Sequence, residues 1–201
     1  MLNLVGDVDP AAVAAEITAG GSAELAGAEH PLIPAEVAPL PFAPAVRRLL
    51  DISPFERNVF CMTRFPRDSD SASDPIARAI TTLRETIART GLVMHLASDR
   101  NADDQLFGNV AAHIWGCKYG IAILETRGSP KGHKTAQLND NVLVEVGAML
   151  VTGRRCALIK DFLAPNLPSD FVAQIYKEVD IDDEAALSDV ATAWVTQDLQ
   201  V

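Results

Sequence analysis

Aromatic residues are scarce in this chain of 201 residues, since Phe, Trp and Tyr together make up 5% of it. Its core must therefore consist mainly of Val, Ile, Leu and Ala, which suits parallel strands buried under helices. Cysteines are also few: only Cys61, Cys117 and Cys156 occur, and no two have the spacing of metal ligands. We expect reduced thiols in a cytoplasmic protein and no metal site.

Long apolar runs are missing too. No stretch approaches the roughly 20 residues that a membrane-spanning helix needs, and the N-terminus lacks the basic region and apolar core of a signal peptide. We therefore expect no membrane association. Neither a G-x-x-x-x-G-K-[ST] phosphate loop nor a G-x-G-x-x-G dinucleotide fingerprint occurs.

Basic residues are outnumbered, because 17 Lys and Arg stand against 27 Asp and Glu, for a net charge of −10. A chain this acidic repels phosphate backbones, so we expect no binding of nucleic acid. The charge is unevenly placed. Residues 1–56 hold eight acids and two bases, whereas residues 57–201 hold 19 acids and 15 bases. The second part is only mildly acidic and stays compatible with a small anionic ligand in a local basic pocket.

The first 56 residues differ in character from the rest. Pro10–Ala19 reads as a short Ala-rich helix, and residues 31–44 contain five prolines, which favours an extended linker. Ala45–Leu50 fits one helical turn. We interpret residues 1–56 as an arm that either packs on a neighbouring chain or lies over the main domain, residues 57–201.

From Arg57 onward, short apolar segments alternate with segments of helical periodicity. Strands are predicted over 58–63, 92–97, 119–124, 155–160 and 175–179, and helices over 74–90, 103–115, 141–151, 171–174 and 183–197. This alternation predicts an α/β fold, with a parallel five-stranded sheet flanked by helices. The third strand is wholly apolar, so we place it in the centre. Ligands of such sheets bind outside the carboxyl ends of the strands.

The predicted helix over 141–151 contains one carboxylate in apolar surroundings. Glu145 lies one helical turn after Asn141 and shares its face, and most of its neighbours are Val, Leu, Met or Ala. Burial raises the pKa of a carboxyl group, and such groups are typical nucleophiles or acid–base catalysts. The structural alternative is a glutamate bonded to nearby loop amides or to Arg64.

The segment NDNVLVEVG, residues 139–147, resembles the N-x-N-V-x-x-E-x-G signature of TIR-like and nucleoside 2-deoxyribosyltransferase-like proteins. Further segments resemble that group in the same order: NVFCMTRFP (58–66), GLVMHLASDRNADDQLFGNV (91–110), CKYGIAILE (117–125), RRCALIKD (154–161) and NLPSDF (166–171). The resemblance spans about residues 57–181 and does not include the first 56.

This resemblance implies a flavodoxin-like sheet that binds a nucleotide. In enzymes of the group, a Glu at the position of Glu145 cleaves or transfers an N-glycosidic bond, through an oxocarbenium-like centre as in glycoside hydrolysis. NAD is the substrate in the TIR branch, so the resemblance implies an NAD nucleosidase that needs no cofactor. The alternatives are a nucleoside 2-deoxyribosyltransferase-like enzyme and a non-catalytic nucleotide-sensing module.

Several further residues are candidates for substrate binding. Arg64 either meets phosphates or forms an ion pair with Asp68 or Asp99. Asp99 binds the ribose or caps a turn, and Phe65 stacks on a base or closes the crevice. The full set of substrate-binding candidates is Arg64, Phe65, Asp99, Glu125, Asn139, Asn141 and Gly147.

The polar segment 126–138 departs from the deoxyribosyltransferase pattern because it is long and basic. It favours a phosphorylated ligand, although a solvated surface loop has the same composition. The resemblance also implies a homo-oligomer, because TIR-like enzymes commonly complete their sites through self-association. A protein partner that binds through the N-terminal arm is a further expectation.

Overall fold

The computed structural model describes residues 42–65, 74–99, 102, 106–126, 138–167 and 176–200. The predicted helices over 10–19 and 171–174 lie outside these residues, as does most of the Pro-rich segment.

Five parallel strands form one sheet in the order β2-β1-β3-β4-β5. The strands are β1 (Asn58–Met62), β2 (Val93–His95), β3 (Tyr119–Leu124), β4 (Arg155–Asp161) and β5 (Tyr176–Val179). This is the predicted α/β fold, with flavodoxin-like topology. β3 occupies the centre as predicted, and all six of its residues are buried.

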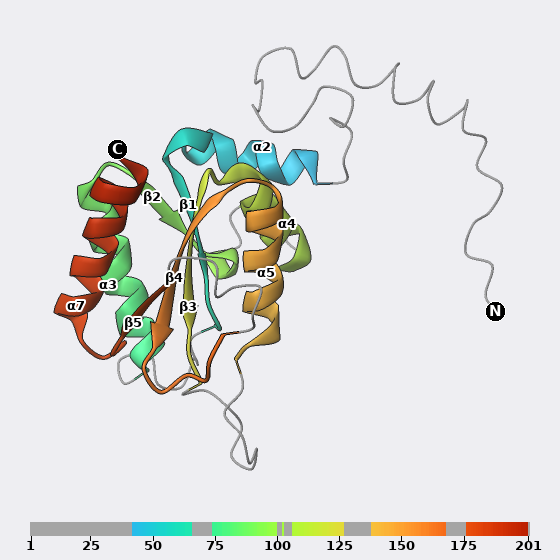
Figure 1. The fold of residues 1–201 in the computed structure, drawn as a ribbon. Helices are drawn as coiled ribbons and strands as arrows, with labels where there is room; N and C mark the ends of the chain where they lie inside the picture. Colours follow the sequence, from blue (N-terminus) through green and yellow to red (C-terminus); the bar gives the residue numbers. More distant parts are fainter. Residues whose placement is uncertain are drawn as a thin grey trace, which may run out of the picture.

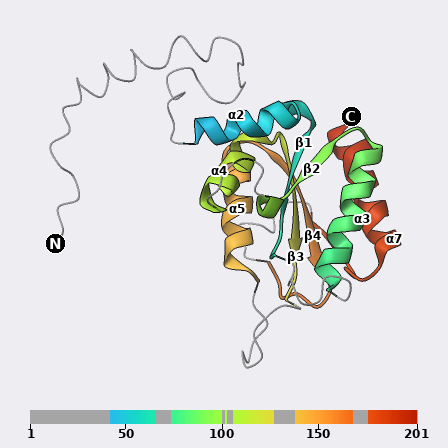
Figure 2. The ribbon, with the colours of Figure 1, turned by 180° about the vertical axis from the view of Figure 1, so that it is seen from behind.

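Helices cover both faces of the sheet. They are α2 (Ala43–Ile52), α3 (Pro75–Arg89), α4 (Leu106–Gly116), α5 (Asp140–Val151) and α7 (Glu184–Ala193), which continues as a π-helix, η4 (Trp194–Leu199). Two short 3₁₀ helices are η2 (Phe55–Arg57) and η3 (Ala97–Asp99). α3 and α7 lie on one face, and α4 and α5 lie on the other (Figures 1 and 2).

Local signals fix the ends of the helices. The Asp74 side chain accepts a hydrogen bond of 3.0 Å from the Ile76 amide and caps α3, and Asn139 caps α5 in the same way. Gly91 and Gly153 follow the ends of α3 and α5 with φ of +83° and +79°. These are backbone angles that L-residues with a side chain rarely adopt.

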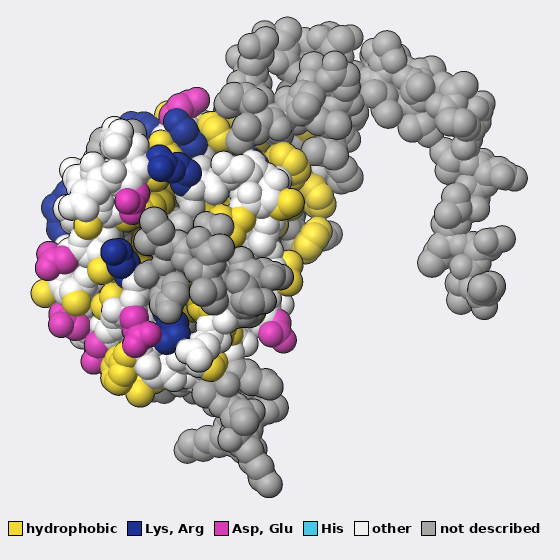
Figure 3. Space-filling view, in the orientation of Figure 1, with side chains coloured by type: hydrophobic (Ala, Val, Ile, Leu, Met, Phe, Trp, Pro, Cys, Tyr) yellow, Lys and Arg dark blue, Asp and Glu magenta, His cyan; other side chains and the backbone are white. Residues whose placement is uncertain are grey.

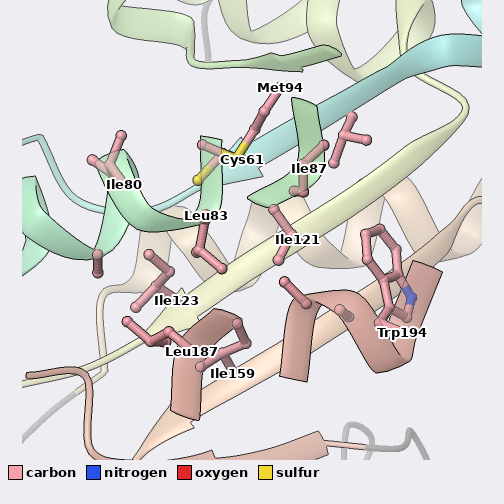
Figure 4. Packing of buried hydrophobic residues seen from close by; sticks show 14 of the residues in the cluster. Cys61, Ile80, Leu83, Ile87, Met94, Ile121, Ile123, Ile159, Leu187 and Trp194 are labelled. Carbon is pink, nitrogen blue, oxygen red and sulfur yellow. The ribbon is translucent and has the colours of Figure 1, made fainter. Parts of the chain in front are cut away.

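The face under α3 and α7 is packed with aliphatic side chains from strands and helices alike. Leu83 of α3 and Leu187 of α7 are fully buried against Ile121 and Ile159 of the sheet, as Figure 4 shows. The opposite face buries a second cluster in which Phe60 and Val146 take part. Aliphatic residues thus fill the core, as the low aromatic content predicts.

α2 lies over the domain rather than apart from it. Its Leu49 is fully buried and lies so close to Gly116 of α4 that a Cβ atom there would come within 2.7 Å of Leu49 Cδ2. The Phe42 ring, just before α2, meets the Phe107 ring edge-to-face at 5.7 Å. Residues 43–52 form three turns of helix instead of the single turn expected, because packing on α4 stabilises them.

Among the described residues, no helix has the length and apolar character that crossing a membrane requires.

Candidate functional site

Three charged side chains meet at the carboxyl ends of β1 and β3, which point to the same end of the molecule (Figure 1). Arg64 follows β1, and its Nε donates to Glu125 Oε1 at 2.7 Å. Its Nη1 donates to Asp74 Oδ2 at 2.8 Å, and these hydrogen bonds with Asp74 are the main cause that raises the pKa of Arg64. Asp74 therefore has two functions, since it also caps α3.

Two polar atoms at this edge of the sheet are buried without a hydrogen-bond partner among the described residues. They are Glu125 Oε2 and Thr63 Oγ1. A buried acceptor without a donor costs about 1–3 kcal/mol. Both atoms are therefore suited to accept a hydrogen bond from a hydroxyl group or a water molecule at this edge.

Glu145 lies on α5, between the sheet-facing side of the helix and the solvent. Val142 and Val146 beside it are buried, and Glu145 itself is half-buried. This burial raises the pKa of its carboxyl group to about 7. In the described part of the chain it has neither a hydrogen bond nor an ion pair. The expected alternative, a bond to Arg64, is not formed, because Arg64 is engaged by Asp74 and Glu125.

The pKa of the Cys61 thiol on β1 depends on burial and on nearby charges, including that of Glu145. Burial is the main cause that raises the pKa of Cys61 to about 12, and the negative charges of Asp99 and Glu145 raise it further. Cys61 is the fourth residue of β1, two positions before Thr63. The positive charge of Arg84 lowers the same pKa, so the thiol is influenced by charges from α3, from the turn after β2 and from α5.

Asp99 is held in a turn after β2. Its Oδ2 accepts a hydrogen bond from the Leu96 amide at 3.1 Å and pairs with Arg84 Nη2 at 3.1 Å. These contacts stabilise the η3 turn. As a result, β2 ends at His95, whereas the predicted strand extends to residue 97. The expected ion pair between Arg64 and Asp99 is wrong, and the second suggested partner, Asp68, lies outside the described residues.

The remaining candidates lie shortly after β1 or belong to α5 and its N-cap. Phe65 is 47% exposed, and Asn139 accepts the capping hydrogen bond of α5. Asn141 is exposed. A Cβ atom on Gly147 would meet nothing within 4 Å, so packing within the described chain does not require glycine there. The roles of these residues in ligand binding stay predictions.

The basic residues of the predicted polar loop, Arg127, Lys131, His133 and Lys134, lie outside the described residues. Within the described ranges, no group of three or more His, Cys, Asp or Glu is placed to hold a metal ion.

No family model matches this chain, and no curated protein matches it. The sheet order shows a flavodoxin-like fold, and this fold serves many unrelated functions. The function must therefore be argued from the site itself.

Proposed function

We propose that this protein cleaves the N-glycosidic bond of a nucleotide, with NAD as the substrate and Glu145 as the catalytic carboxylate. The observation that carries the proposal is the state of Glu145, which is half-buried, has no partner in the described chain, and has a pKa raised to about 7. A carboxyl group with these properties is suited to act near neutral pH.

The negative charge of the carboxylates at this edge of the sheet favours a substrate whose reacting group is positively charged. Among the described residues of this edge, the carboxylates of Asp74 and Glu125 outnumber the guanidinium of Arg64 that they hold. The bond between nicotinamide and ribose in NAD joins a positively charged pyridinium to C1′ of the sugar. A surplus of carboxylates stabilises both this pyridinium and the oxocarbenium-like centre that follows it.

The proposed reaction is a hydrolysis and requires neither an oxidant nor a reductant. The bond between C1′ and the pyridinium nitrogen breaks, and its electron pair stays on nicotinamide, which leaves as a neutral molecule. Glu145 stabilises the developing cation at C1′, or forms a bond with it. Water then supplies a hydroxyl group to C1′, and one proton is released.

The orphaned acceptors fit the sugar. Glu125 Oε2 and Thr63 Oγ1 are both buried and receive no hydrogen bond from another described residue, and each can accept one from a ribose hydroxyl. Arg64 is less suited to phosphate, because a phosphate group would compete with the two carboxylates that already hold its guanidinium.

Incubation of the full chain with NAD, followed by chromatographic measurement of nicotinamide, tests the proposal. We expect nicotinamide and ADP-ribose in equal amounts, at a rate proportional to protein concentration. Two parallel incubations separate the alternatives. Transfer of the sugar of deoxyadenosine to added cytosine, with NAD left intact, replaces the proposal with a deoxyribosyltransferase. Thermal stabilisation by NAD that stays intact over hours replaces it with a nucleotide sensor.

A further inference from the structure

A cavity of about 370 Å³ lies at the other end of the molecule, near the amino-terminal end of β4. It is lined by the start of β4, the end of α5 and the C-terminal α7 and η4, and Glu145 is not among its described lining residues. Its volume is in the range of small-molecule sites. The cavity lining includes Arg154, Arg155, Lys177, Val190, Trp194 and Asp198.

Arg154 places a buried positive charge in the cavity wall. The residue is 4% exposed, and its guanidinium donates to the backbone carbonyls of Thr152 at 3.0 Å and Trp115 at 3.2 Å. It also lies over the Trp115 ring at 5.3 Å. Among the described residues no carboxylate pairs with it, and burial lowers its pKa. Its Nε also donates to the Cys117 carbonyl at 3.5 Å. Backbone carbonyls near the ends of α4 and α5 therefore hold this guanidinium, and it contributes to the cavity through its positive charge.

Two exposed bases add to this charge. Lys177 of β5 lies beside Ile159 of β4, and Arg155 is four residues before Ile159, so all three side chains emerge on one face of the sheet. Neither Arg155 nor Lys177 forms an ion pair with another described residue. Among the described residues of the lining, only Asp198 is acidic, so this described part of the lining has a net positive charge.

The cavity also offers an apolar surface. Val190 of α7 and Trp194 of η4 belong to the lining, and apolar atoms contribute to the wall together with the polar groups. Trp194 is the first residue of a six-residue π-helix, whose wide turn also brings Asp198 to the cavity. π-helical turns are rare and occur frequently at functional sites.

We propose that this cavity is a second binding site, for a small organic anion with a flat apolar body and a carboxylate or phosphate group. Arg155 and Lys177 meet the negative charge, the buried Arg154 adds to the positive potential, and Val190 and Trp194 contact the apolar part. The described lining of the cavity contains neither Glu145 nor Arg64 nor Glu125. Binding of an anion in the cavity therefore does not depend on whether the protein cleaves NAD. Several Lys and Arg side chains are present toward this end of the molecule in Figure 3.

The dye 8-anilinonaphthalene-1-sulfonate combines an anionic group with flat aromatic rings and is a direct probe. We expect it to bind the full chain one-to-one, with energy transfer from tryptophan to the dye. The double variant Arg155→Glu/Lys177→Glu should raise the Kd of the dye about tenfold, because two attractive charges become repulsive. Both residues are exposed, so the variant should fold normally.

The matched control is the double variant Arg47→Glu/Arg57→Glu, which also reverses two charges, at residues that are absent from the described lining. It should leave the Kd unchanged. If the dye binds the wild type, the control and the Arg155→Glu/Lys177→Glu variant with equal affinity, it reports on exposed apolar surface such as Phe107, and the proposal is overturned. Absence of dye binding to the wild type overturns it as well.

Competition identifies the charged group of the ligand. Phenyl phosphate and benzoate should displace the dye, and the stronger of the two shows whether the site prefers phosphate or carboxylate. Neutral benzyl alcohol has a similar apolar part and should compete at least tenfold more weakly, about the loss expected when charge attraction is removed. Equal competition by benzyl alcohol would contradict an anion site.

Discussion

Arg64 and Glu125 form an ion pair of 2.7 Å that joins the end of β1 to the end of β3. The Arg64 side chain is 14% exposed and that of Glu125 is 5% exposed. Because Asp74 holds the same guanidinium from α3, one arginine connects two strands and a helix at the edge where the sheet would bind a ligand. The contacts fix the positions of the groups around the orphaned Glu125 Oε2.

Removal of Arg64 should therefore destabilise the protein strongly. Arg64→Met removes the guanidinium that the buried carboxylates of Asp74 and Glu125 share, and we expect a loss of about 3–5 kcal/mol in the free energy of unfolding by urea. Arg57→Met is the matched control, since Arg57 is exposed and, among the described residues, its side chain donates to the Gly91 carbonyl and to no carboxylate. An equal loss in both variants would show that the buried pair has no special structural role.

The order of strands and helices could be predicted from the sequence because each element carries its own signals. Asp74 and Asn139 cap helices, Gly91 and Gly153 follow them, and the apolar run that starts at Tyr119 marks the central strand. These signals act over a few residues, so the sequence alone is sufficient to find them.

Contacts between distant residues could not be predicted in this way. The partners of Arg64 are ten and 61 positions away, and the local pattern does not indicate which acidic residue pairs with it. The buried network in which His95 Nε2 lies 3.0 Å from Asn58 Oδ1 and 3.1 Å from Ser53 Oγ depends on the same long-range packing. Glu145 was identifiable because its apolar neighbours are local, and the structure accordingly shows it half-buried.

Replacement of Glu145 should change how stability depends on pH. The pKa of its carboxyl group is about 7 in the folded protein, against an ordinary value of 4.5, so the folded state binds more protons between these values. The stability it contributes is full below pH 4.5 and is lost as pH rises through 7. We therefore compare the free energy of unfolding of Glu145→Gln with that of the wild type. The difference should shift in favour of the variant by about 1–2 kcal/mol when the pH is raised from 5 to 8, allowing for partial exposure. Urea unfolding at both pH values measures this, and a constant difference would contradict the raised pKa.

His113 should cause a loss of stability in acid. Its ring is fully buried, its Nδ1 donates to the Asn109 carbonyl, and its Nε2 has no partner in the described chain. Burial lowers its pKa below 6.5, so its contribution to stability is present above pH 6.5 and is lost as pH falls. The free energy of unfolding of His113→Leu, measured relative to that of the wild type, should increase by about 1–2 kcal/mol when the pH is lowered from 7.5 to 5. A thermal or urea series that shows no such gain would contradict a neutral buried ring.

The rate of NAD cleavage should follow the ionisation of Glu145. If the carboxylate form stabilises the cation at C1′, kcat/KM should rise about tenfold per pH unit below pH 7 and become level above it. Initial rates of nicotinamide release between pH 5.5 and pH 8.5 give this profile. A rate that falls as pH rises through 7 would mean that the protonated form acts, as a general acid.

The most direct test of the account compares nicotinamide release from NAD by the wild type, Glu145→Gln and Glu85→Gln. Glu85 is an exposed residue of α3, so its variant makes the same chemical change away from the site. We predict that Glu145→Gln lowers kcat by about a hundredfold or more, while it folds normally and retains thermal stabilisation by NAD, and that Glu85→Gln equals the wild type. Unchanged nicotinamide release by Glu145→Gln would contradict the central claim that this carboxylate is the catalytic group.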